Sequence, residues 1–109
     1  MEDKKITPEE LYEKLQKNER VYILDVRAEE KYTEFHIEDP RIESVNVPKN
    51  FILEGKGEAS SLPEKEEVIV VCTTGNSAAK CANILAQQQE KVVVLEGGIT
   101  AWKDFIKTR

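Results

Sequence analysis

The 109-residue sequence contains few of the residues that build metal centres or disulfide frameworks. It has two cysteines, Cys72 and Cys81, and a single histidine, His36. Four good Cys/His ligands cannot be gathered from this inventory without carboxylates, so we expect no metal site, and no other cofactor is expected. Two cysteines are also a poor disulfide framework, and a reactive thiol or a buried one is the more natural use of each.

Long apolar runs and clustered positive charge are missing as well. No stretch approaches the roughly 18 consecutive apolar residues of a membrane span, and the first ten residues, MEDKKITPEE, lack the apolar core of a signal peptide. We therefore expect a cytoplasmic protein with no membrane partner. The formal net charge is −5. Because binding nucleic acid requires clustered Lys and Arg, no nucleic-acid partner is expected.

The residues that are present fit one ordinary globular domain. Hydrophobic residues make up 39% of the chain and charged residues 34%, and this length suffices for a single core, so we expect one domain over 1–109. The only linker-like stretch is EGKGEASSLPEKEE, at 54–67. It is too polar to bury and is predicted to be a surface loop.

Apolar runs alternate with helix-like spacings along the chain. Strands are predicted at 21–26, 44–48, 67–71 and 91–95, where β-branched residues are frequent. Helices are predicted after Thr7, a capping residue followed by Pro8, and also at 28–35, after the loop 73–77, and beyond 97–98. Strands that alternate with helices predict an α/β domain with a parallel sheet and right-handed crossovers.

Cys72 directly follows the most apolar of these predicted strands. The segment TTGNS, at 73–77, separates it from the next helix. Gly75 and Asn76 are residue types that tolerate positive φ, so this loop can turn its N–H groups inward as an anion-binding nest beside the helix N-terminus. Such a nest stabilises a thiolate, which predicts a Cys72 nucleophile activated without a histidine base. The alternative is a small apolar residue that merely ends a buried strand.

The second cysteine has a different setting. Cys81 shares a helical i, i+3, i+4, i+7 stripe with Ala78, Ala82 and Leu85, so it is predicted to be part of the core.

Three further side chains have a structural interpretation as well as a functional one. Arg27 could reach the edge of the sheet where Cys72 lies, but an ion pair with Asp25 or another nearby acid is the preferred interpretation. His36 is expected to be a structural hydrogen-bonding residue rather than a catalyst. Trp102 is expected to anchor the core rather than to bind substrate.

Three segments resemble the signatures of the rhodanese, or sulfurtransferase, family. The first is LDVR at 24–27, followed by HI at 36–37 and VNVP at 45–48. CTTGNSAAK, at 72–80, falls where the family carries its Cys-x-x-Gly-x-Arg-Ser loop. LEGGI at 95–99 with AW at 101–102 matches the closing L-x-GG-x-x-A-W signature. Their order and spacing identify the chain as a member of this family.

The resemblance implies a three-layer α/β/α rhodanese fold, with a five-stranded parallel sheet flanked by helices. It also implies an enzyme whose cysteine takes a sulfane sulfur from thiosulfate or a persulfide, becomes a persulfide itself, and passes the sulfur to a thiol or cyanide. By position, Cys72 is that cysteine. The residues that would bind the substrate and stabilise its charge are Thr73, Thr74, Gly75, Asn76, Ser77 and Ala78, with hydroxyl groups from Thr73, Thr74 and Ser77 adding hydrogen bonds.

The chain departs from the family pattern in its loop. Ser77 and Ala78 stand where the family commonly has Arg and Ser. A hydroxyl contributes about 0.5–1.5 kcal/mol, against about 1.5–3 kcal/mol for a charged donor, and it lacks the bidentate grip of a guanidinium group. We therefore expect weaker binding of thiosulfate and a preference for persulfide or polysulfide donors. Phe35, in place of the glycine usual before His36, is taken as a packing variation.

Two other functions remain open at this stage. The chain could be a sulfur-relay or interaction module that handles sulfur only when a partner protein delivers it, which the missing arginine favours. A cysteine phosphatase is disfavoured, because such enzymes need an arginine to stabilise transition-state charge, and residues 73–80 contain none.

Overall fold

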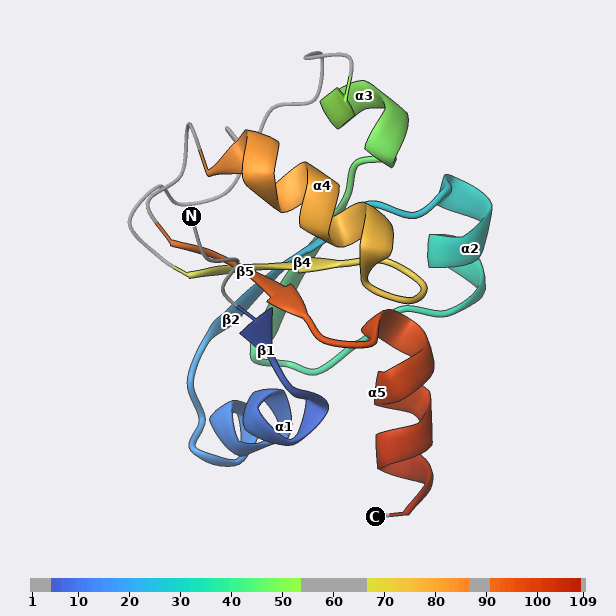
Figure 1. Cartoon of the computed structure of the whole chain (residues 1–109). Coiled ribbons are helices and arrows are strands. Elements are labelled where there is room, and N and C mark those ends of the chain that lie inside the picture. Colours follow the sequence, from blue (N-terminus) through green and yellow to red (C-terminus); the bar gives the residue numbers. More distant parts are fainter. Residues whose placement is uncertain (1–4, 54–66, 87–90, 109) are drawn as a thin grey trace.

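A computed structural model describes residues 5–53, 67–86 and 91–108. Strands and helices follow one another along the chain (Figure 1). In order they are β1 (Lys5–Ile6), α1 (Pro8–Gln16), β2 (Val21–Asp25), α2 (Glu29–Glu34), β3 (Ile42–Asn46), α3 (Lys49–Leu53), β4 (Val68–Val71), α4 (Asn76–Leu85), β5 (Val92–Leu95) and α5 (Gly98–Lys107). Apart from Glu67, the surface loop predicted at 54–67 lies outside the described residues.

The five strands form one sheet in the order β1-β5-β4-β2-β3. All four neighbouring pairs run parallel. At the centre, Val70 of β4 lies between Leu24 of β2 and Val94 of β5. The carboxyl end of β4 therefore lies in the middle of the sheet, where neighbouring strand ends surround it. The predicted parallel sheet is confirmed.

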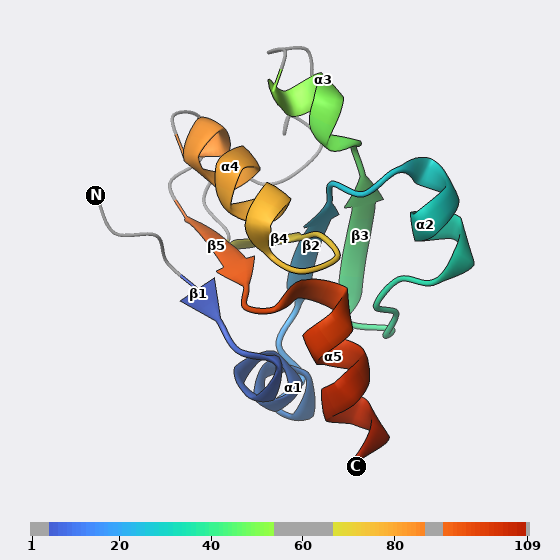
Figure 2. The same ribbon diagram turned by 45° about the vertical axis from the view of Figure 1, so that its right-hand side comes forward.

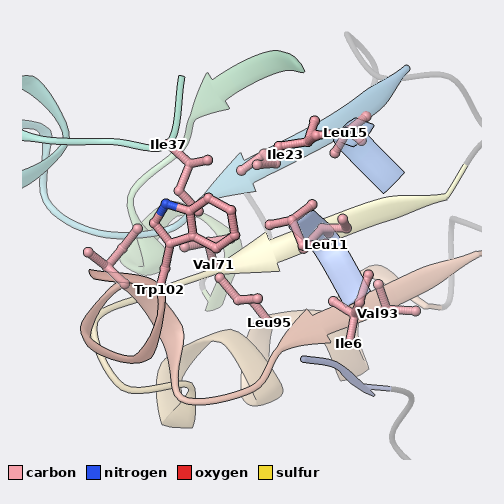
Figure 3. Close-up of a cluster of buried hydrophobic side chains, with 12 residues drawn as sticks. Ile6, Leu11, Leu15, Ile23, Ile37, Val71, Val93, Leu95 and Trp102 are labelled. Atoms are coloured by element: carbon pink, nitrogen blue, oxygen red, sulfur yellow. The ribbon is translucent and has the colours of Figure 1, made fainter. Parts of the chain in front are cut away.

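Helices cover both faces of the sheet, which gives the three layers that the resemblance implied. α3 and α4 lie on one face, and α1 and α5 lie on the other (Figures 1 and 2). Alternate side chains of a strand point to opposite faces, so Val70 packs with Cys81 and Leu85 of α4, while Val71 packs with residues of α1 and α5. The buried side chains on the face covered by α1 and α5 form one cluster (Figure 3), which includes Ile6, Leu11, Leu15, Ile23, Ile37, Val71, Val93, Leu95 and Trp102.

The start of α1 shows how local sequence produces local structure. The Thr7 hydroxyl accepts a hydrogen bond from the Glu10 N–H at 3.1 Å, and the Glu10 carboxylate accepts one from the Thr7 N–H at 2.9 Å. This capping box satisfies two backbone donors that a helix end would otherwise leave free. Leu11 and Leu15 then turn into the core, where both are buried.

Two elements were not located by the predictions, and several boundaries differ from them by one or two residues. β1 is the fifth strand that the resemblance implied, but its position was not predicted; it is only two residues long and pairs with Val94 and Leu95. α3 was also not anticipated, and it buries Ile52 against the α4 face. β3 begins at Ile42, opposite Val21, which is two residues before the predicted start. In the part of the chain that the structure describes, no helix has the length and apolar character needed to cross a bilayer.

Candidate active site

Cys72 is the first residue after β4, at the carboxyl edge of the sheet. Residues 73–75 link it to α4, and this loop lies close to the first turn of α5 (Figures 1 and 2). The Cys72 residue is only 4% exposed. The sheet thus delivers the thiol to the place where neighbouring strand ends and helix starts converge, which is where parallel sheets gather functional groups.

Two backbone groups donate hydrogen bonds to the Cys72 sulfur. The Gly75 N–H lies 2.9 Å from Sγ and the Ala78 N–H lies 3.3 Å from it. Gly75 reaches this position with a φ of 100°, a conformation that other residues rarely adopt. It is also the residue that precedes the first turn of α4. The sulfur therefore lies at the positive end of a ten-residue helix, where negative charge is stabilised.

The loop between Cys72 and α4 is shorter than the sequence predicted. Asn76 was expected to share the positive φ of Gly75, but it is the first residue of α4 and has no positive φ. Because Gly75 alone makes the turn, the helix begins directly after it, at Asn76, which is two residues earlier than predicted. Asn76, Ser77 and Ala78 consequently form the first helical turn, and Ala78 is positioned to donate its N–H to the sulfur.

A second set of hydrogen bonds fixes the other side of the loop. The Ile99 N–H donates to the Cys72 carbonyl at 2.8 Å, and the Thr100 N–H donates to the Thr73 carbonyl at 3.1 Å. Gly98, with a φ of 60°, lies so close to both carbonyls that a Cβ there would approach them at 2.3 and 2.6 Å. The first turn of α5 therefore holds the carbonyl side of the loop while its N–H side faces the sulfur.

A cavity of about 280 Å³ opens onto Cys72. The residues that line it come from the ends of β2 and β3, from α2 and α3, and from Cys72, the loop after it and the first turn of α4. They are Val26, Arg27, Ala28, Lys31, Pro48, Lys49, Asn50, Cys72, Thr73, Thr74 and Ser77. Among the predicted site residues, four thus line the cavity. Gly75 and Ala78 act instead through their N–H groups, and Asn76 is exposed.

The hydroxyl groups of Thr73, Thr74 and Ser77 were expected to add hydrogen bonds to a bound substrate, which stays a prediction; the structure shows where they lie relative to the thiol. Within the described residues, no hydrogen bond joins the Cys72 sulfur to Thr73, Thr74 or Ser77; its donors are the two backbone N–H groups. The Ser77 hydroxyl instead faces the Lys49 ammonium, with Nζ at 3.5 Å from Oγ. Thr73 and Thr74 are exposed residues of the cavity wall, where a bound ligand can meet them.

Arg27 forms the ion pair that the sequence favoured. Its guanidinium group donates to both Asp25 carboxylate oxygens, at 2.8–3.1 Å, and also to the Phe35 carbonyl. The side chains of Arg27 and Asp25 are only 7% and 1% exposed. Removing one partner of such a buried pair leaves an uncompensated charge, so Arg27 chiefly holds the cavity wall in place.

His36 and Trp102 take structural positions. His36 Nδ1 lies 2.9 Å from the Tyr32 carbonyl, and Nε2 lies 2.9 Å from the Glu38 carboxylate. The imidazole also stacks on the Tyr32 ring, with centroids 4.0 Å apart. His36 does not line the Cys72 cavity. Trp102 is buried in the core beneath the sheet (Figure 3), as predicted.

Cys81 is fully buried, which confirms its predicted place in the core. Burial raises the pKa of its thiol to about 11; the neighbouring Cys72 adds to this increase, and the Lys49 charge opposes it. Cys81 therefore remains a protonated, unreactive thiol near neutral pH. The two cysteines are chemically distinct because only Cys72 lies beside helix N–H groups and opens onto a cavity.

The raised pKa of Cys81 predicts a loss of stability at alkaline pH. An unfolded thiol titrates near pH 8.5, whereas the folded one titrates near 11. Between these values the unfolded state binds fewer protons, so the free energy of unfolding falls as pH rises, by roughly 2–3 kcal/mol between about pH 8 and about pH 10.5. Urea denaturation at about pH 8 and about pH 10.5 measures this. Cys81→Ala lacks this titration and should lose less stability; equal losses in both proteins would contradict the prediction.

No cluster of three or more His, Cys, Asp or Glu side chains that could hold a metal ion occurs among residues 5–53, 67–86 and 91–108.

Comparison with known proteins agrees with the family resemblance found in the sequence. The family model for the rhodanese-like domain matches residues 7–105. YtwF of Bacillus subtilis (strain 168) is 29% identical over 110 residues, which cover 100% of this chain and 99% of YtwF. The crystal structure of a rhodanese-like domain protein from Staphylococcus aureus is 31% identical, with a TM-score of 0.74, and covers 91% of this chain and 90% of that one.

The domain also matches a segment within larger proteins. In Ogataea parapolymorpha, the relative named adenylyltransferase and sulfurtransferase uba4 is 29% identical over 103 residues, which cover 84% of this chain but only 25% of uba4. The matching proteins thus include some named sulfurtransferases.

Proposed function

The chain belongs to the rhodanese-like domain family, which includes proteins named sulfurtransferases, and we propose that it transfers sulfane sulfur through a persulfide on Cys72. The donor is thiosulfate or a small persulfide or polysulfide, and the acceptor is a thiol or cyanide. The observation that supports this most is the pair of N–H groups that donate to Sγ at 2.9 and 3.3 Å. They stabilise negative charge on sulfur both before and after the transfer.

The first step loads the cysteine. The Cys72 thiolate attacks the outer sulfur of thiosulfate, a new S–S bond forms, and the S–S bond of the donor breaks. Sulfite leaves with the electron pair of that bond, and Cys72 becomes a persulfide anion. With a persulfide or polysulfide donor, the shortened thiolate or polysulfide leaves instead. The backbone donors compensate the charge of the persulfide, as an oxyanion hole does for oxygen.

The second step returns the enzyme to its starting state. A thiolate or cyanide attacks the terminal sulfur of the persulfide, and the S–S bond to Cys72 breaks. The product is a new persulfide or thiocyanate, and the electron pair returns to Cys72 as thiolate. No external oxidant or reductant is needed, and no general base is needed once the thiolate has formed.

The proposal is tested by weighing the protein after exposure to a donor. Thiosulfate, glutathione persulfide and inorganic polysulfide are each mixed with the protein, and adducts are located by peptide mass spectrometry. We expect one added sulfur atom on Cys72 and none on buried Cys81, which serves as an internal control. If none of the three donors adds sulfur to Cys72, the proposal is wrong.

The choice of donor depends on Ser77, which is part of the cavity wall. We expect Ser77→Arg to lower the KM for thiosulfate roughly five- to tenfold, because a charged donor replaces a neutral one. The KM for polysulfide, which has no oxyanion group for a guanidinium to grip, should change less. Steady-state thiosulfate:cyanide assays of both proteins measure this effect. An unchanged thiosulfate KM would show that the charge at this position does not limit binding.

A second function is favoured by the absence of an arginine in the loop and by the match to a segment of uba4. In this sulfur-relay function, Cys72 of the chain receives sulfur from a partner protein rather than from a free donor. This relay predicts negligible turnover of thiosulfate by the isolated chain, with transfer appearing only when a sulfur-loaded partner is added. Steady turnover of a small donor without any partner would remove the reason for this alternative.

A further inference from the structure

The wall of the Cys72 cavity carries a charge opposite to that of the whole chain. Arg27, Lys31 and Lys49 are among the residues that line it, and none of the described lining residues is an aspartate or glutamate. The chain as a whole has a formal net charge of −5. A cavity lined by positive charge on a negatively charged protein concentrates anions at its mouth. The excess of positive charge is therefore a local property of this cavity.

The three basic residues are not equally available to a ligand. Arg27 is buried and its guanidinium group is held by Asp25 and the Phe35 carbonyl. Lys31 and Lys49 are both exposed. Within the part of the chain that the structure describes, neither has a carboxylate partner. Two ammonium groups are thus free to meet an anion, and they come from α2 and α3, outside the loop.

Lys49 is the better placed of the two. Its Nζ lies 3.5 Å from Ser77 Oγ, so the ammonium is beside the position where the family resemblance leads one to expect an arginine. Its charge also reaches the neighbouring Cys81, because it acts to lower the pKa of that thiol against the larger effect of burial. An ammonium group at this place can supply the charge that the loop itself lacks.

We propose that Lys49 selects anionic ligands for reaction at Cys72, with a smaller contribution from Lys31. As applied to sulfur donors, this inference rests on the proposed function. An ammonium group is a point charge without the planar fork of a guanidinium, so it does not distinguish a sulfonate from a carboxylate by shape. The ligands are therefore small sulfur compounds with either anionic group, including thiosulfate and carboxylate-bearing persulfides such as glutathione persulfide.

Two alkylating agents test the role of Lys49 without any sulfur transfer. Iodoacetate and iodoacetamide react with a thiolate in the same way: a C–S bond forms, the C–I bond breaks and iodide leaves. Only iodoacetate is anionic. We measure both rates at Cys72 by peptide mass spectrometry and compare the ratio of the iodoacetate rate to the iodoacetamide rate. Lys49→Gln should lower this ratio roughly three- to fivefold, as expected for one exposed charge, and Lys49→Arg should preserve it.

A matched control is available on α4. Lys80 is exposed, lies in the same helix as Ser77 and does not line the cavity. Lys80→Gln changes the net charge by the same amount and should leave the ratio unchanged. Added salt should reduce the difference between wild type and Lys49→Gln, because it screens exposed charges. If the ratio in Lys49→Gln falls no further than in Lys80→Gln, the inference is wrong.

This test separates the two proposals. A protein that alkylates as described but takes up no sulfur refutes the sulfurtransferase function and leaves the role of Lys49 intact. If Cys72 takes up sulfur but Lys49→Gln leaves the alkylation ratio unchanged, the inference about Lys49 is wrong and the sulfurtransferase function stands. Where turnover is present, Lys49→Gln should raise the KM for thiosulfate and for glutathione persulfide by similar factors and leave kcat nearly unchanged, because the ammonium binds the ground state and transition state alike.

Discussion

Cys72→Ser is expected to abolish sulfur transfer. A serine hydroxyl cannot carry a sulfane sulfur as a persulfide, and it is a far weaker nucleophile than a thiolate at neutral pH. Turnover of any donor should fall by at least about 10³-fold, the size of effect seen when a covalent nucleophile is removed. The fold should survive, because a serine oxygen can accept the hydrogen bonds of Gly75 and Ala78 that now reach Sγ. The change in stability should stay within about 1 kcal/mol.

Cys81→Ala is the matched control for this loss of activity. It removes the other thiol, which lies in the core and outside the cavity lining. Donor-to-cyanide turnover, followed by the appearance of thiocyanate, should persist in Cys81→Ala and vanish in Cys72→Ser. Thermal denaturation of both variants shows that each is folded at the assay temperature. If folded Cys72→Ser turned over the donor at the wild-type rate, the reacting residue would not be Cys72.

Gly98→Ala is expected to produce the largest loss of stability of any single methyl group added at the site. The new Cβ would lie 2.3 Å from the Cys72 carbonyl oxygen and 2.6 Å from that of Thr73, both of which are backbone atoms. The positive φ of 60° adds its own cost for a residue with a side chain. Together these effects should destabilise the protein by roughly 2–5 kcal/mol, or lower its Tm by roughly 10–25 °C.

Gly75→Ala separates the collision from the backbone strain. Gly75 also has a positive φ, but a Cβ there would meet no atom closer than 3.4 Å. Its cost should therefore be that of the φ angle alone, about 1–2 kcal/mol. Thermal and urea denaturation of both variants give the comparison. In Gly98→Ala, alkylation of Cys72 by iodoacetamide should also slow down, because the carbonyl side of the loop has moved. Equal stability losses in the two variants would show that the close approach of Gly98 has no energetic consequence.

The core and the sheet could be predicted because they depend on regular patterns. Four consecutive β-branched residues in β4 indicate a strand buried on both faces, and the spacing of Ala78, Cys81 and Leu85 indicates which side of α4 is buried. Both predictions are confirmed. β1 and α3 could not be found in this way. A two-residue strand has no period, and five residues make little more than one helical turn, so both depend on their contacts with other elements.

The site was predictable where it is local in sequence and unpredictable where it depends on distant segments. The position of Cys72 after β4 and the turn at Gly75 follow from adjacent residues. By contrast, Lys49 approaches Ser77 only because α3 forms and packs beside α4. The hydrogen bonds from Ile99 and Thr100 to the loop carbonyls likewise join residues far apart in the chain. The resemblance indicated that the glycine pair before Ile99 belongs to a family signature, but it did not indicate what Gly98 contacts.

The support that α5 gives to the Cys72 loop has a consequence for biosynthesis. The carbonyls of Cys72 and Thr73 accept hydrogen bonds from donors that are synthesised 27 positions later, at Ile99 and Thr100. At translation rates of about 5–20 residues per second, the ribosome adds these donors roughly one to five seconds after the cysteine. During this interval the two carbonyls lack the donors that hold them in the finished structure. The hydrogen bonds around the Cys72 loop are thus completed late in synthesis, once the segment that contains Gly98 has docked.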